Sequence, residues 1–442
     1  MTSGGPMRHT ITFDEAFRFW LKLGFISFGG PAGQIAIMHR ELVEQRRWIS
    51  EGRFLHALNY CMLLPGPEAQ QLATYIGWLM HRTWGGIVAG ALFVLPSFVL
   101  LIILSWVYVR FGDLPWVAGI LHGIKPAVVA IVLHAAWRIG TRALKNPWSW
   151  GIAVAAFSAI ALLGVPFPLI ILGAAAIGAL AGGRLTANPT DQHRKGTAAA
   201  GGAVIDDDTP TPAHASYSSR RLAITIGTGL LLWALPLVLI AASVGWAGTP
   251  MRMGWFFTKA ALLTFGGAYA VLPYVYQGAV SQFHWLTAAQ MIDGLALGET
   301  TPGPLIMIVT FVGFVGGWNQ ADTTFTLGAA IAGASVATYF TFLPSFIFIL
   351  TGGPVIESTH RTPRWKAPLT AITAAVVGVI VNLAIVFGEH VFLPAGAGQP
   401  ADWIAIALFV VAAVALFRFR IGVVPLIGAF GAIGLSLQWF VQ

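Results

Sequence analysis

Two proline-glycine-proline triplets and two glycine pairs interrupt apolar stretches of this chain. The triplets are Pro65-Gly66-Pro67 and Pro302-Gly303-Pro304, and the pairs are Gly29-Gly30, which Pro31 follows, and Gly266-Gly267. Such breaks free backbone N–H groups, and a helix that begins at a break directs its positive dipole end toward it. Several helix N-termini in one place predict an anion-binding site. Close helix packing at small residues remains an alternative explanation for any single glycine pair.

Two lysines stand at equivalent distances ahead of the glycine pairs. Lys22 and Lys259 each lie seven residues before the first paired glycine, which is about two helical turns. A buried ammonium group needs a partner, so we expect these two lysines to share a doubly charged oxyanion. Snorkelling of each lysine to a membrane interface is the alternative, and we prefer it for Lys125.

Two carboxylates accompany the triplets. Glu68 follows the first triplet directly, and Glu299 precedes the second by three residues. A carboxyl group at membrane depth can carry protons near neutral pH, so we predict proton coupling; helix capping or pairing with a buried lysine is equally compatible with these positions. Nearby hydroxyl and amide groups could donate hydrogen bonds to an oxyanion: Thr300, Thr301, Gln70 and Gln71.

The composition requires these residues to be positioned by membrane helices. Of the 442 residues, 57% are hydrophobic and 10% are charged, with a mean hydropathy of +0.76, so we predict an all-α polytopic membrane protein embedded in the lipid bilayer. The net charge of +8 then reports topology, and we expect no nucleic-acid partner. We expect no cleavable signal, no cofactor, no metal and, with the single Cys61, no disulfide.

The chain contains an internal duplication. At a constant shift of 237 positions, "FWLKLGFISFGG" aligns with "FFTKAALLTFGG", and the two triplets coincide without a gap. After an insertion, "LPSF" at Leu95 aligns with "LPSF" at Leu343. Between the halves, residues 184–221 are polar and rich in Gly, Pro, Ser and Thr, which predicts a flexible, water-exposed cytoplasmic tether. We therefore divide the chain into an N-terminal repeat (1–183), this linker, a linking transmembrane helix (222–250) and a C-terminal repeat (251–442).

Basic residues favour opposite orientations of the two repeats. The loop 39–53 carries four arginines, whereas its counterpart 276–290 carries no lysine or arginine. We therefore predict two inverted-topology repeats, each with two broken or re-entrant helical hairpins followed by about four transmembrane helices. The expected crossings are 84–109, 117–137, 148–163, 167–183, 222–243, 325–350, 367–387, 402–417 and 421–440. A parallel duplication and kinked full crossings are the alternatives.

Several of these stretches resemble one family of transporters. "FGGPAGQIA", Trp48, "LLPGPEAQQLATYIGW", "LTFGGAYAVLPY" and "LGETTPGPLIM" are similar to the long-chain members of the chromate ion transporter family. The resemblance implies a bacterial inner-membrane exporter of chromate, driven by protons or by the membrane potential. It carries the family's motif positions onto Gly29, Gly30, Pro31, Trp48, Pro65, Gly66, Pro67, Glu68, Gln71, Gly266, Gly267, Glu299, Thr300, Pro302, Gly303 and Pro304.

Other functions stay open at this point. Sulfate has the charge and shape of chromate, so sulfate-type uptake is the first alternative, and a non-transporting assembly protein is the second. An enzyme is not expected, because the sequence contains no HExxH, GxSxG or Cys/His grouping. Association as a homodimer is open as well.

Overall fold

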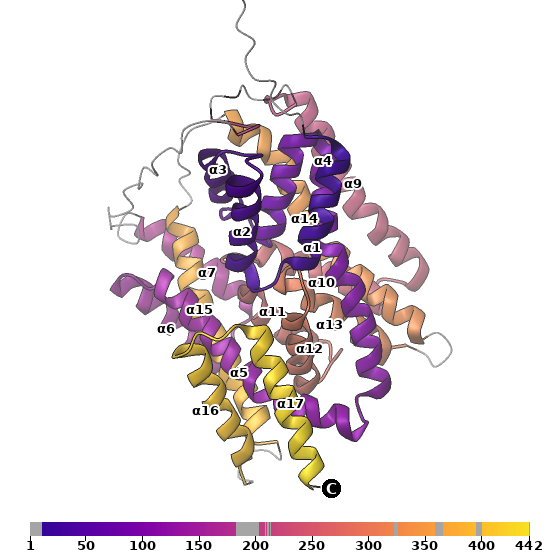
Figure 1. Ribbon diagram of the computed structural model, residues 1–442, viewed down its shortest axis with the longest axis vertical. Coiled ribbons are helices and arrows are strands. Elements are labelled where there is room, and N and C mark those ends of the chain that lie inside the picture. Colours follow the sequence, from indigo (N-terminus) through magenta and orange to yellow (C-terminus); the bar gives the residue numbers. More distant parts are fainter. Residues whose placement is uncertain are drawn as a thin grey trace, which may run out of the picture.

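The computed structural model of this protein describes residues 11–182, 203–207, 209, 212, 214–321, 326–358, 366–394 and 400–441. The described chain is built from helices, which are arranged as an elongated bundle (Figure 1). In order they are α1 (Phe13–Ile26), α2 (Gly30–His39), η1 (Arg40–Gln45), α3 (Glu51–Cys61), α4 (Glu68–Phe111), α5 (Pro115–Ala143), α6 (Pro147–Leu163), α7 (Phe167–Ala181), α9 (Ser219–Val244), α10 (Thr249–Leu263), η2 (Ala268–Val271), α11 (Leu272–Tyr276), η3 (Gln277–Gln282), α12 (Ala288–Thr300), η4 (Leu305–Met307), α13 (Ile308–Asn319), α14 (Thr326–Ser358), α15 (Lys366–Phe392), α16 (Trp403–Phe417) and α17 (Val423–Val441).

Length and composition identify the helices that can cross a membrane. Among the described residues, five helices are long and apolar enough for this: α4, α5, α9, α14 and α15. The helices α6, α7, α13, α16 and α17 are apolar but shorter. The prediction of an all-α polytopic membrane protein is therefore confirmed at this level of detail.

The last helices of the two halves are interlocked. Helix α5 packs against α16 and α17, and α15 packs against α6 and α7. Since α5 and α15 occupy equivalent positions in the duplication, each contacts the two helices that end the other half. Buried residues on both, including Val128 and Val376, lie in one hydrophobic cluster. The two halves consequently share a core.

Helical structure is interrupted at all four predicted breaks. In the first half, α1 ends at Ile26 and α2 begins at Gly30, while α3 ends at Cys61 and α4 begins at Glu68. In the second half, α10 and α12 end just ahead of the glycine pair and of the triplet. The glycines at the breaks all have positive φ angles, a conformation that side chains with a Cβ avoid: Gly29, Gly30, Gly66, Gly266, Gly267 and Gly303.

The chain reverses direction soon after the first triplet. Within α4, His81 and Arg82 depart from helical dihedral angles, and the helix folds back on itself there. A Cβ built on Gly77 would lie 2.5 Å from the Gly85 carbonyl oxygen, so the two arms touch through their backbones. The predicted hairpin around the first triplet, over residues 54–80, requires a reversal at this point, because the crossing expected at 84–109 follows it; the placement of the hairpin in a membrane stays a prediction.

Part of the segment between the halves is bound to the first half. The Val204 N–H donates to the Arg47 carbonyl at 3.0 Å, and the Ser50 N–H donates to the Ile205 carbonyl at 2.9 Å. The Arg53 Nε donates to the Asp206 carbonyl at 3.1 Å. These bonds differ from our expectation of a free tether, because the short apolar pair of Val204 and Ile205 packs against the cluster around α1 to α4. Residues 183–202 lie outside the described residues, and α9 begins three residues before the expected position 222.

Candidate functional site

Two backbone hydrogen bonds join the breaks of one half to the breaks of the other. The Gly66 N–H donates to the Thr264 carbonyl at 2.8 Å, and the Gly303 N–H donates to the Ser27 carbonyl at 2.7 Å. The shift of 237 positions relates Ser27 to Thr264 and Gly66 to Gly303, so these are equivalent bonds made in both directions. Each triplet thus lies against the residues that lead into the glycine pair of the opposite half. The structure brings the four breaks together.

Two buried glutamines fix the backbone of the breaks. The Gln34 side chain on α2 donates to the carbonyls of Gly303 and Ser27, and the Gln71 side chain on α4 donates to the Pro65 carbonyl at 2.8 Å. Gln71 was expected to donate to a substrate, but its amide group donates to the Pro65 carbonyl of the first triplet and to Ser345 Oγ at 3.4 Å. Gln34 was missed because its repeat equivalent is the apolar Val271, so the duplication gives it no signal. The Oε1 atoms of both glutamines have no hydrogen-bond partner within the described residues.

Other residues expected at the site form hydrogen bonds within their own helices, near the helix ends. Thr300 and Thr301 donate to the carbonyls of Leu297 and Gly298 at 2.8 and 2.9 Å, so their hydroxyl hydrogens close the last turn of α12. Gln70 likewise bonds Thr74 within α4. The prolines stand where a missing N–H costs nothing: Pro31 in the first turn of α2, and Pro67 and Pro304 immediately before α4 and η4.

Arg138 of α5 provides a positive charge at the breaks. A Cβ built on Gly30 would lie 3.9 Å from Arg138 Nη2, so the guanidinium group lies at the N-terminus of α2. Its charge interacts with the carboxylate of Glu299, which also accepts a hydrogen bond from the Tyr269 hydroxyl. Arg138 and the N-terminus of α2 therefore lie beside one another, with the Glu299 carboxyl group within range of the arginine's charge. This is a suitable set of groups for an oxyanion and a proton.

The Glu68 carboxyl group interacts with a different arginine of α5. Arg142, one helical turn beyond Arg138 on α5, interacts electrostatically with Glu68 at the N-terminus of α4. The two carboxylates predicted to carry protons thus each face an arginine of the same helix. The sequence placed both arginines beyond the expected crossing 117–137, whereas α5 continues to Ala143.

The two predicted lysines do not lie with these groups. The side chains of Lys22 and Lys259 are exposed on the faces of α1 and α10 that point away from the buried residues of those helices. Neither lysine has a hydrogen bond or an ion pair with any residue that the structure describes. The expectation that they hold a shared oxyanion is not supported by this placement, and snorkelling to an interface fits it better.

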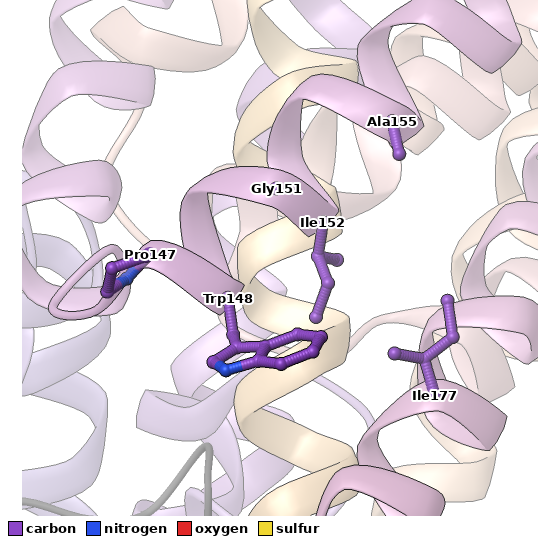
Figure 2. A pocket seen from close by; sticks show the side chains of 6 residues that line it. All are labelled: Pro147, Trp148, Gly151, Ile152, Ala155 and Ile177. Carbon is purple, nitrogen blue, oxygen red and sulfur yellow. The ribbon is translucent and has the colours of Figure 1, made fainter.

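The structure contains two distinct hollows away from the breaks. One, of about 360 Å³, lies between α6 and α7 and is lined by apolar groups such as Ile152 and Ile177 (Figure 2). The indole nitrogen of Trp148 is its one polar side-chain atom, so it offers no charge to an oxyanion. The other hollow, of about 530 Å³, is lined by polar residues that include Lys125 and Asp293. Lys125, for which we preferred snorkelling, has a buried partner in this hollow, because its Nζ lies 3.5 Å from Asp293 Oδ2.

Comparison with known proteins gives a consistent result for both halves. The model of the chromate transporter family matches residues 15–179 and 251–435. A chromate transport protein of Pseudomonas aeruginosa is 33% identical over 388 residues, which cover 86% of this chain and 83% of that protein. A chromate transport protein of Cupriavidus metallidurans is 30% identical over 384 residues, covering 86% and 84%. A probable chromate transport protein of Synechococcus elongatus is 29% identical over 376 residues. No solved structure matches this chain.

Proposed function

Because the chain belongs to the chromate transporter family, we propose that it exports chromate from the cytoplasm across the bacterial inner membrane, with the oxyanion bound where the four breaks meet. The family supports chromate as the substrate. The observation that carries the position of the site is the Arg138 guanidinium group at the N-terminus of α2, beside the glycine pair.

The groups at this position match the chemistry of a tetrahedral dianion. The first turn of α2 has N–H groups without partners inside the helix, and its dipole favours negative charge. A guanidinium group can donate two parallel hydrogen bonds to an oxyanion and stays charged at any relevant pH. Glycines at positions 29 and 30 let a ligand approach the backbone closely, because no Cβ is in the way.

Proton coupling would use the carboxyl groups beside the arginines. When an oxyanion binds Arg138, the carboxylate of Glu299 loses part of its compensating charge, and a proton on Glu299 removes the resulting repulsion. A dianion that leaves with this proton carries one net negative charge outward, so the membrane potential, negative inside, would drive export. The Tyr269 hydroxyl donates to the ionised carboxylate of Glu299, and it would accept a hydrogen bond from the protonated carboxyl group. Glu68 and Arg142 form the second such pair.

Alternating access between two inverted halves is the mechanism that we propose. The equivalent bonds Gly66 to Thr264 and Gly303 to Ser27 cross between the halves, so rocking one half against the other would change the two bonds in opposite senses. In this arrangement the segment 203–207 lies on the cytoplasmic side together with the basic loop 39–53.

Chromate uptake into inside-out membrane vesicles tests the site. Arg138→Gln should reduce the initial rate at low chromate by at least about thirtyfold, since removal of a charged partner of a bound anion costs about 2 kcal/mol or more. The matched control is the double variant Lys22→Ala/Lys259→Ala, which removes two exposed cations and should stay within about twofold of the parent rate. The opposite ranking of these two variants would place the substrate at the lysines and overturn the proposed site.

Chromate resistance of whole cells, compared with uptake into the vesicles, separates export of chromate from the alternatives. A cell that expresses a chromate exporter becomes resistant to chromate, whereas a cell that gains a sulfate-type uptake system becomes more sensitive. Sulfate in excess should compete with chromate for uptake in either case, because the two dianions have the same shape and charge. Resistance without any vesicle uptake would point to a non-transporting assembly protein.

A further inference from the structure

The hollow beside Lys125 is a polar cavity at one end of the bundle. Its lining comes from the end of α4, the first turns of α5 and α12, and the last residues of α13 and α17. Figure 1 places the C-terminus, near which α17 ends, at the end of the molecule opposite α3. The cavity is thus separated from the segment 203–207, which is bound next to α3.

Asp293 lines this cavity, and only one of its two carboxylate oxygens has a hydrogen-bond partner within the described residues. Its side chain is 5% exposed, and its Oδ2 atom receives both the Lys125 Nζ at 3.5 Å and the Tyr108 hydroxyl at 3.0 Å. Its Oδ1 atom is buried and has no hydrogen-bond partner within the described residues. Since buried carboxylate oxygens are normally paired, Oδ1 marks a place for a further atom.

Lys125 could reach a ligand in the cavity without moving far. Its side chain is 27% exposed, so the ammonium group contacts Asp293 on one side and open space on the other. An ammonium group has three donors, and Asp293 occupies one direction. The charged and titratable groups around Asp293 are Lys125 and His122 from α5, Tyr108 from α4, and Asp113 after α4. His122 itself lies 3.5 Å from Asp402.

We propose that this cavity is a second oxyanion site, in which a tetrahedral dianion binds Lys125 while Asp293 takes up one proton from water. The inference rests on the proposed oxyanion transport and adds a binding step at the end of the molecule opposite α3. A dianion that replaces Asp293 as the partner of Lys125 leaves a buried carboxylate beside two negative charges, which is strongly unfavourable. Protonation removes that charge and turns the free oxygen into an O–H donor for the anion.

Helix α12 connects this second site to the breaks. Asp293 and Glu299 lie six residues apart on α12, which corresponds to about 9 Å along the helix axis. Both face a cation on α5, Lys125 in the cavity and Arg138 at the breaks. The two helices thus present two carboxyl–cation pairs in succession along the bundle.

Sulfate protection of a cysteine in the cavity tests the inference. Cys61 is the only cysteine and is buried, so Cys61→Ala gives a background without thiols. Ala289→Cys places a thiol in the cavity one helical turn before Asp293, and Ser436→Cys places a control thiol on α17 outside it. Sulfate is the probe because chromate oxidises thiols. An uncharged maleimide avoids competition with the anion.

In purified protein we expect sulfate to slow labelling of Ala289→Cys and not of Ser436→Cys. The sulfate concentration that gives half protection should be at least about fivefold lower near pH 6 than near pH 8, because proton and anion favour each other's binding. Asp293→Asn mimics the protonated state, so its half-protection value should be low at both pH values. The double variant Lys125→Gln/Asp293→Asn leaves no unpaired charge and should lose protection.

Several outcomes would overturn the inference. These are absence of protection in the parent protein, protection that persists in the double variant, or a pH dependence that persists in Asp293→Asn but disappears in His122→Asn. Elution of each variant as a single peak on size exclusion shows that the fold is kept. Chromate uptake is measured on the same proteins: uptake without protection removes the second site and leaves the proposed function, whereas protection without uptake does the reverse.

Discussion

At the residue scale, the carboxyl group of Glu299 is in contact with one proton donor and near one cation. The Tyr269 hydroxyl donates to it, and the Arg138 charge acts on it from α5. An anion bound to Arg138 weakens the attraction that keeps Glu299 ionised. In the proposed site, substrate and proton therefore act on the same carboxyl group, and a substitution at Glu299 would separate transport from proton coupling.

Glu299→Gln should abolish the response of chromate uptake to an imposed pH gradient. The amide cannot exchange a proton, but it keeps the size of the side chain and can still accept a hydrogen bond from Tyr269. Exchange of labelled for unlabelled chromate, which needs no net proton movement, should continue at a rate within about tenfold of the parent. The control is Glu389→Gln at an exposed position of α15, which should leave both activities unchanged. Loss of exchange together with the pH response would mean that Glu299 has a structural role.

The comparison of lysines with arginines shows what residue spacing can predict. Lys22 and Lys259 attracted attention because the duplication relates them, but equal spacing does not determine which side of a helix faces the core. On α1 the buried side is formed by Ala16, Trp20 and Leu23, so Lys22 faces outward. Arg138 has no basic equivalent in the second half, and its position beside α2 became visible only with the length of α5 and the placement of α2.

At the element scale, the breaks depend on glycines whose backbone conformation disfavours every residue with a Cβ. Gly66 has a φ angle of +126°, and a Cβ on it would lie 2.3 Å from Ser345 Oγ. Gly303 has a φ angle of +100°, and a Cβ on it would lie 3.1 Å from the Ser97 Cβ. Both glycines also donate the hydrogen bonds that join the halves. Strain at either one should disturb both the fold and the site.

Gly66→Ala should lower the stability of the protein by about 1–3 kcal/mol from backbone strain, with a further loss from the contact with Ser345. Chromate uptake per amount of folded protein should fall as well. Gly151→Ala is the matched control, because Gly151 lies within α6 and a Cβ on it would meet nothing within 4 Å. That change should stabilise α6 by about 1 kcal/mol. Thermal unfolding in detergent compares the two, and equal unfolding temperatures would contradict the importance of the Gly66 conformation.

The bound part of the segment between the halves contains a pH-sensitive contact. The His214 Nε2 donates to the Trp78 carbonyl at 3.0 Å, and its ring packs edge-on against the Trp78 indole. Burial lowers the pKa of His214, the hydrogen bond to Trp78 partly opposes this, and the charges of Arg82 and Arg221 lower the pKa further. A histidine with a lowered pKa stabilises the folded contact fully above its ordinary pKa of about 6.5. This contribution is lost as the pH falls through the lowered value.

Acidification should therefore release the segment around His214. Hydrogen exchange of the Val204 and Ile205 amides, corrected for the intrinsic effect of pH, should become faster below about pH 6. His214→Asn keeps a donor for the Trp78 carbonyl without a titrating ring, so its corrected exchange should not change over the same range. An identical pH step in this variant would assign the effect to other groups.

The elements also show which parts of the fold could be predicted. Glycine and proline carry conformational preferences of their own, so all four breaks were placed correctly from the sequence. The pairing of each triplet with the opposite glycine pair is long-range and has no local signal. The attachment of Val204 and Ile205 was missed because two apolar residues within a polar segment look insignificant without the surface that they cover.

At the scale of the whole molecule, each contact from the first half to the second has an equivalent contact from the second half to the first in the pairs described below. The pair α5 with α17 corresponds to the pair α15 with α7, and the bond from Gly66 to Thr264 corresponds to the bond from Gly303 to Ser27. Even the π-helices η1 and η3 coincide at the shift of 237 positions. Such two-way contacts are expected of repeats related by a two-fold axis, and basic residues favour an axis that lies in the membrane plane.

Opposite exposure of equivalent loops tests this orientation. Gln45 and Gln282 end η1 and η3, both side chains are exposed, and the duplication relates them. In the Cys61→Ala background, an impermeant maleimide added to intact cells should label Gln282→Cys and leave Gln45→Cys unlabelled, because the four arginines of the loop 39–53 favour the cytoplasmic side. Both positions should react after permeabilisation, which is the control for accessibility. Labelling of both from outside, or of neither, would place equivalent loops on one side and replace the inverted arrangement by a parallel one.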